Sequence, residues 1–269
     1  MDAEAEYNNR ARVADHAAVM QGWARDSAAF RESWPHAALG LAYGPGEREK
    51  LDLFLPGPGE AHPLAMFMHG GYWQALDRSF ASICARGLVA RGVAVAVPSY
   101  DLCPAVPLAR IVEQMREAAA FMHRRTGRRI LAAGHSAGGQ LAALLMATDF
   151  AARNPALPRD LVPAALPVSG VFELEPLLPT SIARALNLSP AEARALSPRF
   201  LPAPGGALHG VVGAEESGEF IRQTRDFATA WGGSWEALPG ANHFTVLAPF
   251  AEPDHPLVAR AAAMAKRLA

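Results

Sequence analysis

The sequence has little cysteine, no surplus of charge of either sign and no long apolar run. Its 269 residues include two cysteines, Cys84 and Cys103, too few for a disulfide scaffold, and we expect two ordinary thiols in a reducing compartment. The 25 basic and 26 acidic side chains are mixed along the chain, which argues against a nucleic-acid-binding protein. No apolar run is long enough to span a membrane, and segment 1–16 is too polar for a secretory signal peptide. We therefore expect a soluble, cytoplasmic protein that binds neither nucleic acid nor membranes.

The sequence also lacks the spacings that hold metals and organic cofactors. Its nine histidines are scattered, with no HExxH motif and no close histidine–cysteine cluster. It contains no nucleotide or flavin fingerprint. We therefore expect no metal and no organic cofactor. Nothing in the sequence decides the oligomeric state, and a homodimer is one arrangement that it permits.

Hydrophobic residues make up 51% of the chain, enough for a substantial core, and they fall into short runs separated by helix-like stretches. The apolar runs are 64–68, 93–97, 130–133, 164–168 and 208–212, and the helix-like stretches include 80–91, 108–125 and 140–150. Continuous apolar strands that alternate with helices are typical of a mostly parallel sheet with helices on both faces. Such a sheet carries its reactive loops at the carboxyl ends of the strands. The pattern predicts an α/β fold.

Two segments depart from this alternation. In segment 1–40, large apolar residues recur at helical intervals, which predicts an amphipathic helical cover. Segment 172–206 is rich in proline, alanine and leucine, has no clear strand and contains two short helical patterns. We interpret it as a small cap over the carboxyl edge of the sheet. Because we find no repeat and no linker, we interpret residues 1–269 as one domain.

One strand-to-helix turn carries the strongest chemical signal. The run 130–133 leads into a GxSxG motif at 134–138 and then into the helical pattern 140–150. A serine on such a turn adopts a strained backbone conformation that exposes its hydroxyl. The helix beside it offers backbone N–H groups, that of Ala137 first, to an oxyanion. An ordinary serine in a glycine-rich turn is the alternative, but the flanking strand and helix favour Ser136 as the nucleophile of an α/β hydrolase.

A second loop of the required kind follows the apolar run 64–68. Its sequence, His69-Gly70-Gly71, lets the backbone approach the nucleophile and present N–H groups to a developing negative oxygen. Gly70 and Gly71 are therefore candidate oxyanion-hole residues together with Ala137. We expect His69 to hold the loop rather than transfer protons. The alternative is a glycine turn with a structural histidine, which does not account for two such loops in this order.

Three histidines follow the nucleophile and could serve as its base. His209 lies within a strand-like run, and His255 lies in a turn near the last helical pattern. His243 lies in a loop after the apparent strand 235–238, where it could reach Ser136. We therefore predict His243 as the general base.

The catalytic acid is expected between the serine and the histidine, at the end of the preceding strand. Two neighbouring glutamates, Glu215 and Glu216, follow the run 208–212. One of them should hold the imidazole in its productive tautomer and stabilise the imidazolium. The residues alone leave both glutamates open.

Taken together, these motifs resemble the kynurenine formamidase (arylformamidase) branch of the α/β hydrolases, which is related to esterases of the hormone-sensitive-lipase type. The resemblance spans nearly the whole chain and includes YNNR at 7–10, HGGYWQ at 69–74, YDLCP at 100–104, GHSAGG at 134–139 and ESGEFIRQ at 216–223. In the last segment the family has its catalytic aspartate before Ser-x-Glu-Phe. The resemblance therefore assigns the acid to Glu216, with a glutamate in place of the usual aspartate.

The resemblance implies hydrolysis of the formamide of an N-formyl aromatic amine, such as N-formyl-L-kynurenine in tryptophan catabolism, to formate and the free amine. Ser136 would attack the formyl carbon, and His243 would return a proton to the departing nitrogen. Tyr72 and Trp73 are candidates for an aromatic wall around the amine, although plain packing explains them as well. A carboxylesterase acting on small acyl or aryl esters would use the same catalytic residues. A catalytically inactive binding protein is disfavoured, because no catalytic group is missing.

Overall fold

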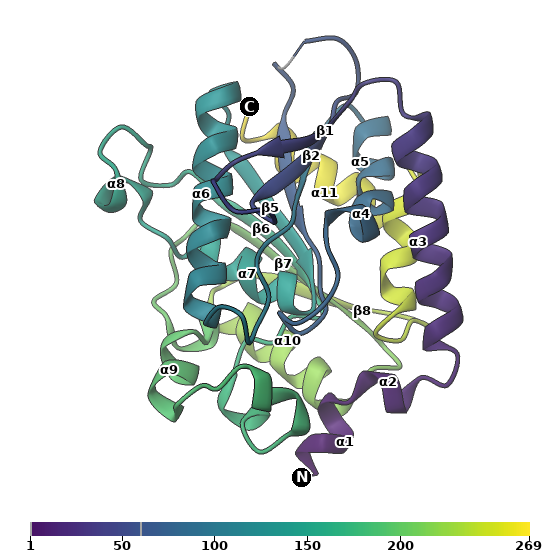
Figure 1. The fold of residues 1–269 in the computed structure, drawn as a ribbon, viewed down its shortest axis with the longest axis vertical. Helices are drawn as coiled ribbons and strands as arrows, with labels where there is room; N and C mark the ends of the chain where they lie inside the picture. Colours follow the sequence, from purple (N-terminus) through teal and green to yellow (C-terminus); the bar gives the residue numbers. More distant parts are fainter. Residues whose placement is uncertain (1, 60) are drawn as a thin grey trace.

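The computed structural model describes residues 2–59 and 61–269, and in them a central eight-stranded sheet has the order β1-β2-β4-β3-β5-β6-β7-β8 (Figure 1). The strands are β1 (Ala37–Ala42), β2 (Lys50–Phe54), β3 (Leu64–Met68), β4 (Ala94–Pro98), β5 (Ile130–His135), β6 (Ala164–Val168), β7 (Ala207–Gly213) and β8 (Ser234–Leu238). The β1–β2 and β2–β4 pairs are antiparallel, and the other pairs are parallel. The predicted, mostly parallel sheet is thus confirmed.

Helices cover both faces of the sheet, as predicted. On one face lie α6 (Leu108–Thr126), α7 (Ala137–Met146) and α10 (Gly218–Ala230); on the other lie α3 (His16–Ser33), α5 (Arg86–Ala90) and α11 (Pro256–Lys266) (Figure 1). The other α-helices are α1 (Ala3–Tyr7), α2 (Asn9–Arg12), α4 (Arg78–Ala81), α8 (Phe150–Arg153) and α9 (Pro190–Ala195). Short 3-10 helices are η1 (Ser82–Ala85), η2 (Glu175–Leu177), η3 (Ser181–Ala185), η4 (Pro198–Phe200) and η5 (Thr245–Ala251).

The two faces of β3 show why its sequence is apolar throughout. Successive side chains of a strand point to opposite faces, and here both faces are covered. Leu64, Met66 and Met68 belong to one hydrophobic core, whereas Ala65 and Phe67 belong to the other. All five side chains are buried.

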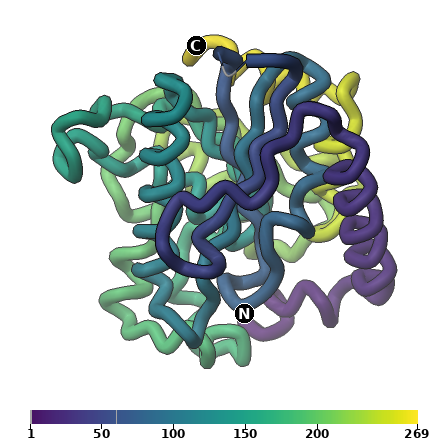
Figure 2. Tube along the Cα trace, turned by 45° about the horizontal axis from the view of Figure 1, so that its top comes forward, coloured from purple at the N-terminus to yellow at the C-terminus, as the bar shows by residue number. Residues whose placement is uncertain are grey.

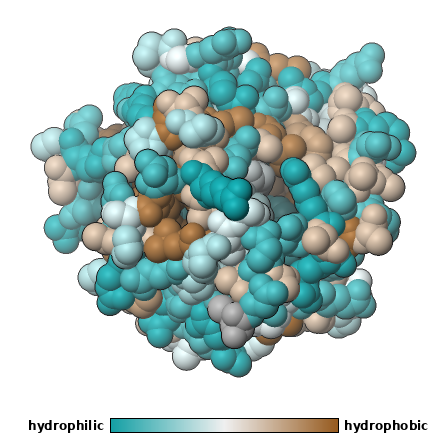
Figure 3. All heavy atoms as spheres, turned by 60° about the horizontal axis from the view of Figure 1, so that its bottom comes forward, coloured by the Kyte–Doolittle hydropathy of each residue, from teal (hydrophilic) through white to brown (hydrophobic). Residues whose placement is uncertain are grey.

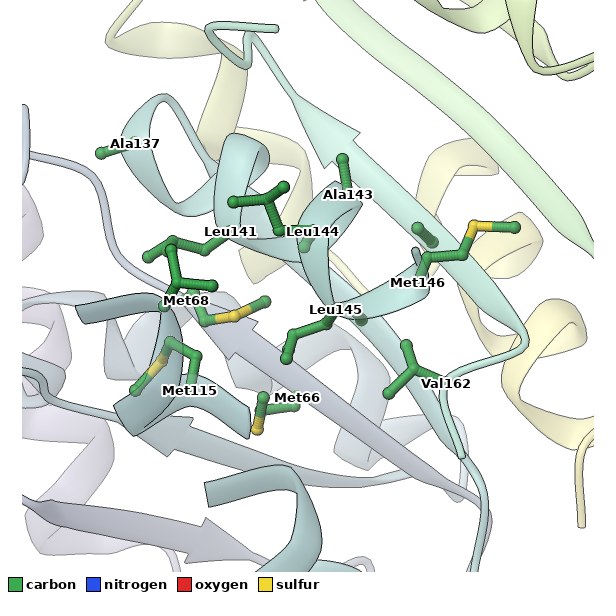
Figure 4. Close-up of a cluster of buried hydrophobic side chains, with 14 of the residues drawn as sticks. Met66, Met68, Met115, Ala137, Leu141, Ala143, Leu144, Leu145, Met146 and Val162 are labelled. Atoms are coloured by element: carbon green, nitrogen blue, oxygen red, sulfur yellow. The ribbon is translucent and has the colours of Figure 1, made fainter. Parts of the chain in front are cut away.

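The first of these cores fills the space between β3, α6 and α7. Figure 4 shows Met66 and Met68 of β3 beside Leu141 and Leu145 of α7 and Met115 of α6. The helix that follows the candidate nucleophile is therefore anchored by its apolar side chains, which fixes where that helix begins.

The N-terminal segment contains more than the predicted helices. Its longest helix, α3, ends at Ser33, and β1 begins at Ala37, so the helical part is shorter than the predicted range 1–40. The N-terminus and the C-terminus lie at opposite ends of the molecule (Figures 1 and 2).

The segment expected to form a cap, 172–206, contains α9 and the turns η2, η3 and η4 and no strand. It lies at the end of the molecule that carries α1 (Figure 1). The Glu4 carboxylate of α1 accepts hydrogen bonds from the backbone N–H and the hydroxyl of Ser181, at 2.8 and 2.7 Å. The N-terminal segment and the expected cap are thus joined directly.

Two further observations concern the helices and the thiols. None of the helices in the described part of the chain has the length and apolar character needed to cross a membrane. Cys84 and Cys103 are both free and buried. Burial raises the pKa of the Cys84 thiol to about 12 and that of the Cys103 thiol to about 11, so both remain protonated at neutral pH.

Candidate active site

Ser136 occupies the sharp turn between β5 and α7. Its backbone has φ 55° and ψ −116°, a conformation that is strained for a residue with a side chain. The turn is so tight that a Cβ on Gly134 would lie 2.4 Å from the carbonyl oxygen of Gly138. A Cβ on Gly138 would lie 2.1 Å from the carbonyl oxygen of Met68. The glycines of the GxSxG motif are therefore required by packing.

The loop after β3 runs directly against this turn. A Cβ on Gly70 would lie 3.2 Å from the Cβ of Ser136, and Gly71 has φ +98°, a conformation suited to glycine. Ala137 is the first residue of α7, so its N–H has no acceptor within the helix. The structure thus places Gly70, Gly71 and Ala137 beside Ser136.

His69 packs beside this loop and is hydrogen-bonded to it. Its ring stacks on that of Tyr100 with centroids 4.1 Å apart, and its Nδ1 donates to the carbonyl oxygen of Gly70 at 2.8 Å. Burial lowers the pKa of His69 to about 4, so the ring is neutral at physiological pH. These contacts match the structural part expected for His69.

His243 and Glu216 form a buried hydrogen-bonded pair. The His243 Nδ1 lies 2.6 Å from the Glu216 Oε2, and the other carboxylate oxygen accepts from the Ser169 hydroxyl at 2.5 Å and from the Gly213 N–H at 2.7 Å. Glu215, by contrast, is exposed to solvent. Of the two glutamates that the sequence left open, the structure brings Glu216 to the histidine.

Two residues that hold this pair were not found from the sequence. Ser169 binds the carboxylate, and the Nε2–H of His135 donates to the carbonyl oxygen of His243 at 2.8 Å. A carbonyl oxygen only accepts, so the proton must lie on the Nε2 of His135. Burial lowers the pKa of His135 well below its usual range, which keeps the ring neutral. The sequence signal that could have identified His135 is its position next to Ser136 in the GxSxG motif.

Ser136 and His243 line one cavity of about 490 Å³, a size suited to a small organic molecule. Aliphatic and aromatic lining is supplied by Met20, Trp23, Ala75, Leu76, Ile182 and Phe244. Polar lining is supplied by Asn8, Asn9, Arg10, Tyr72 and Gln74. The cavity therefore combines the candidate catalytic residues with apolar and polar lining residues.

The two predicted wall residues differ in where they lie. Tyr72 lines the cavity, and its hydroxyl donates to the carbonyl oxygen of Tyr7 at 2.6 Å. Trp73 has no exposed surface and packs in the hydrophobic core, so the structure does not bring it to the cavity. Trp23 of α3 supplies the indole of the cavity wall instead. The sequence placed Trp23 in a helical cover and did not show which part of the sheet that helix covers.

Comparison with known proteins agrees with the fold. Residues 65–197 match a family model described as an alpha/beta hydrolase fold. The kynurenine formamidase of Salmo salar is 30% identical over 81% of this chain and 79% of its own length. That of Drosophila melanogaster is 30% identical over 77% of this chain and 74% of its own length.

Solved structures show the same fold. A putative thioesterase from Silicibacter sp. is 35% identical, with a TM-score of 0.87 over 96% of this chain and 98% of its own. A carboxylesterase from a metagenomic library has a TM-score of 0.75 over 94% of this chain and 96% of its own, and its 19% identity makes this a likeness of fold alone. The protein is a hydrolase, and the chain belongs to the kynurenine formamidase family of α/β hydrolases.

Proposed function

We propose that this protein hydrolyses the formamide of an N-formyl aromatic amine, N-formyl-L-kynurenine or a similar arylformamide, to formate and the free amine. Ser136 acts as nucleophile, His243 as general base and acid, and Glu216 as the orienting carboxylate. The observation that carries the proposal is the His243–Glu216 hydrogen bond of 2.6 Å beside a strained serine in a shared cavity. The curated relatives named kynurenine formamidase supply the substrate class.

The reaction starts with proton transfer from the serine. Because Glu216 accepts the Nδ1–H of His243, the Nε2 of that ring is left to take the Ser136 proton as the oxygen attacks the formyl carbon. The carbonyl oxygen becomes negatively charged, and backbone N–H groups of Gly70, Gly71 and Ala137 stabilise it. The tetrahedral intermediate then collapses.

Collapse breaks the bond between the formyl carbon and the nitrogen. His243 returns the proton to that nitrogen, so the arylamine leaves neutral and a formyl ester remains on Ser136. A water molecule, deprotonated by the same ring, attacks the formyl carbon. Breaking the ester bond regenerates the serine hydroxyl and releases formate.

The lining of the cavity supports an aromatic substrate. Trp23 and Phe244 lie 6.3 Å apart between ring centroids and, with Met20, form an apolar wall of the cavity. An aryl ring bound there would remove apolar surface from water on both partners. The formyl group itself needs little room beside Ser136.

The test compares N-formyl-L-kynurenine with p-nitrophenyl acetate in steady-state kinetics, using the wild type and Ser136→Ala. We expect a formamide kcat/KM well above the ester value and its loss in the variant. Ester turnover without formamide turnover would support the alternative, a carboxylesterase of small acyl or aryl esters. If neither substrate were hydrolysed and a fluorophosphonate failed to label Ser136, the nucleophile assignment would be wrong.

We further propose that residues 1–269 act as one catalytic domain in the cytoplasm; a homodimer is one assembly that the sequence permits. The two free, buried cysteines fit a reducing compartment. Light scattering of the purified protein tests the homodimer, and a monomeric mass across micromolar concentrations would refute it.

A further inference from the structure

One side chain of the catalytic cavity has no part in the proposed reaction. Arg10, in the short helix α2, lines the cavity together with Ser136 and His243. Apart from the histidines, it is the only ionisable cation among the described residues that line this cavity, and no aspartate or glutamate lines it. The cavity therefore carries a fixed positive charge in its lining.

The charge of Arg10 is not neutralised within the described part of the protein, where no ion pair or hydrogen bond of its side chain occurs. The two acids of the neighbouring helix α1 are engaged elsewhere. Glu4 binds the hydroxyl of Ser181 at 2.7 Å, and Glu6 accepts the backbone N–H of Glu219 at 2.9 Å. Arg10 is thus left to pair with an anion that enters the cavity.

The backbone that carries Arg10 is held firmly against the catalytic loops. Its neighbour Asn9 is buried, and the Asn9 amide donates to the Tyr72 hydroxyl at 3.4 Å. That hydroxyl donates in turn to the carbonyl oxygen of Tyr7 at 2.6 Å. Because Tyr72 follows Gly71 of the loop beside Ser136, the position of α2 is coupled to the oxyanion loop.

We infer that Arg10 is a specificity-determining residue of this reaction, whose guanidinium binds the carboxylate of the substrate and favours anionic over neutral N-formyl arylamines. This inference rests on the proposed function and assigns a further residue to it. A guanidinium is always charged at physiological pH and presents a planar pair of donors that matches a carboxylate. With the aryl ring against Trp23 and Phe244, the carboxylate would pair with Arg10, which lines the same cavity.

A charged molecule can approach the cavity over the surface at the end of the molecule that carries α1 and α2. This surface is largely hydrophilic, with separate smaller hydrophobic patches (Figure 3). Arg10 itself is solvent-exposed, so the interaction is partly screened by water and salt. We therefore expect a moderate contribution to substrate binding, not one that decides whether the reaction occurs.

The test measures kcat/KM for two matched probes, the neutral formanilide and the anionic N-formylanthranilate. Arg10→Gln should lower the ratio of the anionic to the neutral value about threefold to tenfold, chiefly through KM. The wild-type preference should also fall as NaCl is raised, because ions screen the exposed charge.

Arg12→Gln is the matched control. Arg12 lies on the same helix and has the same charge, but it contacts the carbonyl oxygen of Ala5 and does not line the catalytic cavity. Its substitution should leave the ratio within twofold. Equal loss on both probes in Arg10→Gln, or the same loss of ratio in Arg12→Gln, would overturn the inference.

A second readout separates this inference from the proposed function. If the enzyme hydrolysed p-nitrophenyl acetate but neither formamide, the proposed function would fail, and anion binding could still be measured. Benzoate should then inhibit ester hydrolysis competitively, with an inhibition constant raised about threefold to tenfold by Arg10→Gln. An inhibition constant unchanged by Arg10→Gln would refute the anion site irrespective of the reaction.

Discussion

Ser169 is subject to two constraints at once. Its backbone has φ 50°, and its hydroxyl donates to the Glu216 carboxylate at 2.5 Å from a site with no exposed surface. Strain in a residue with a side chain persists where the surroundings impose it, and here it aims a donor at a buried carboxylate. We interpret Ser169 as a positioning residue that acts on His243 through Glu216.

We expect Ser169→Ala to lower kcat with little change in KM. Hydrogen bonds to charged groups contribute about 1.5–3 kcal/mol, which corresponds to a fall of about tenfold to a hundredfold. Steady-state kinetics on N-formyl-L-kynurenine gives kcat and KM, and circular dichroism checks that the variant is folded. A folded variant with wild-type kcat would show that Gly213 alone orients the glutamate.

At His135, two variants separate the effect of the hydrogen bond from the effect of ring packing. Gln can place an N–H close to the Nε2 of histidine, whereas Phe keeps the ring shape without a donor. Since the Nε2–H of His135 anchors the His243 carbonyl oxygen, we expect His135→Gln to retain at least tenfold more kcat than His135→Phe. Steady-state kinetics with p-nitrophenyl acetate measures this. Equal activity of the two variants would mean that packing alone matters.

The residues predicted from the sequence were those with a local signature. Ser136 was found because its strained turn demands small neighbours, and a pattern of glycines is visible in the chain. Trp23 was missed because its role depends on where α3 packs against distant segments, including Phe80, with ring centroids 5.7 Å apart. For Trp73 the sequence left both a wall role and plain packing open, because an indole next to the oxyanion loop can point either into the cavity or into the core, and the structure places it in the core.

At the scale of elements, side-chain hydrogen bonds join α1 to the first turns of α10, the helix that follows the proposed catalytic acid. The Tyr7 hydroxyl donates to Glu219 at 2.9 Å and accepts from Gln223 at 2.6 Å. The Glu219 carboxylate also accepts a hydrogen bond from Arg222, at 2.7 Å. Burial raises the pKa of Tyr7 above its usual value, so this hydroxyl remains a donor.

We expect Tyr7→Phe to lower the free energy of unfolding by about 1–2 kcal/mol, because two buried groups lose a hydrogen-bond partner. It should also raise KM, since α1 leads into the segment that lines the cavity. Urea unfolding and steady-state kinetics measure the two effects. Lost stability with unchanged KM would show that the cavity does not depend on this attachment.

Most of the predicted strands have side chains buried on both faces; the exception is the edge strand β8, whose residues are exposed or only partly buried. The run in β3 is apolar at every position because two cores need it, so its sequence alone identifies it. β1 was missed, because its residues are only partly buried and Gly40, with φ 71°, interrupts its pairing with β2. An edge strand of that kind is defined by its partner more than by its own residues.

At the scale of the whole molecule, buried neutral histidines link stability to pH. The pKa of His69 is lowered by burial to about 4, against 6.5 for an accessible histidine. As pH falls below 6.5 the unfolded chain binds a proton at this residue and the folded protein does not. This stabilisation is therefore fully present above pH 6.5 and is lost as pH falls toward 4. His135, whose pKa is also lowered by burial, acts in the same direction.

We expect the free energy of unfolding to fall by about 2 kcal/mol between pH 7 and pH 5 on account of His69 alone. Urea unfolding at pH 7, 6 and 5 measures this slope. His69→Gln should be less stable at pH 7, having lost its stacking on Tyr100, but its slope should be shallower than that of the wild type. His36→Gln, at an exposed position, should retain the wild-type slope. A slope in His69→Gln parallel to the wild type would mean that other groups cause the acid sensitivity.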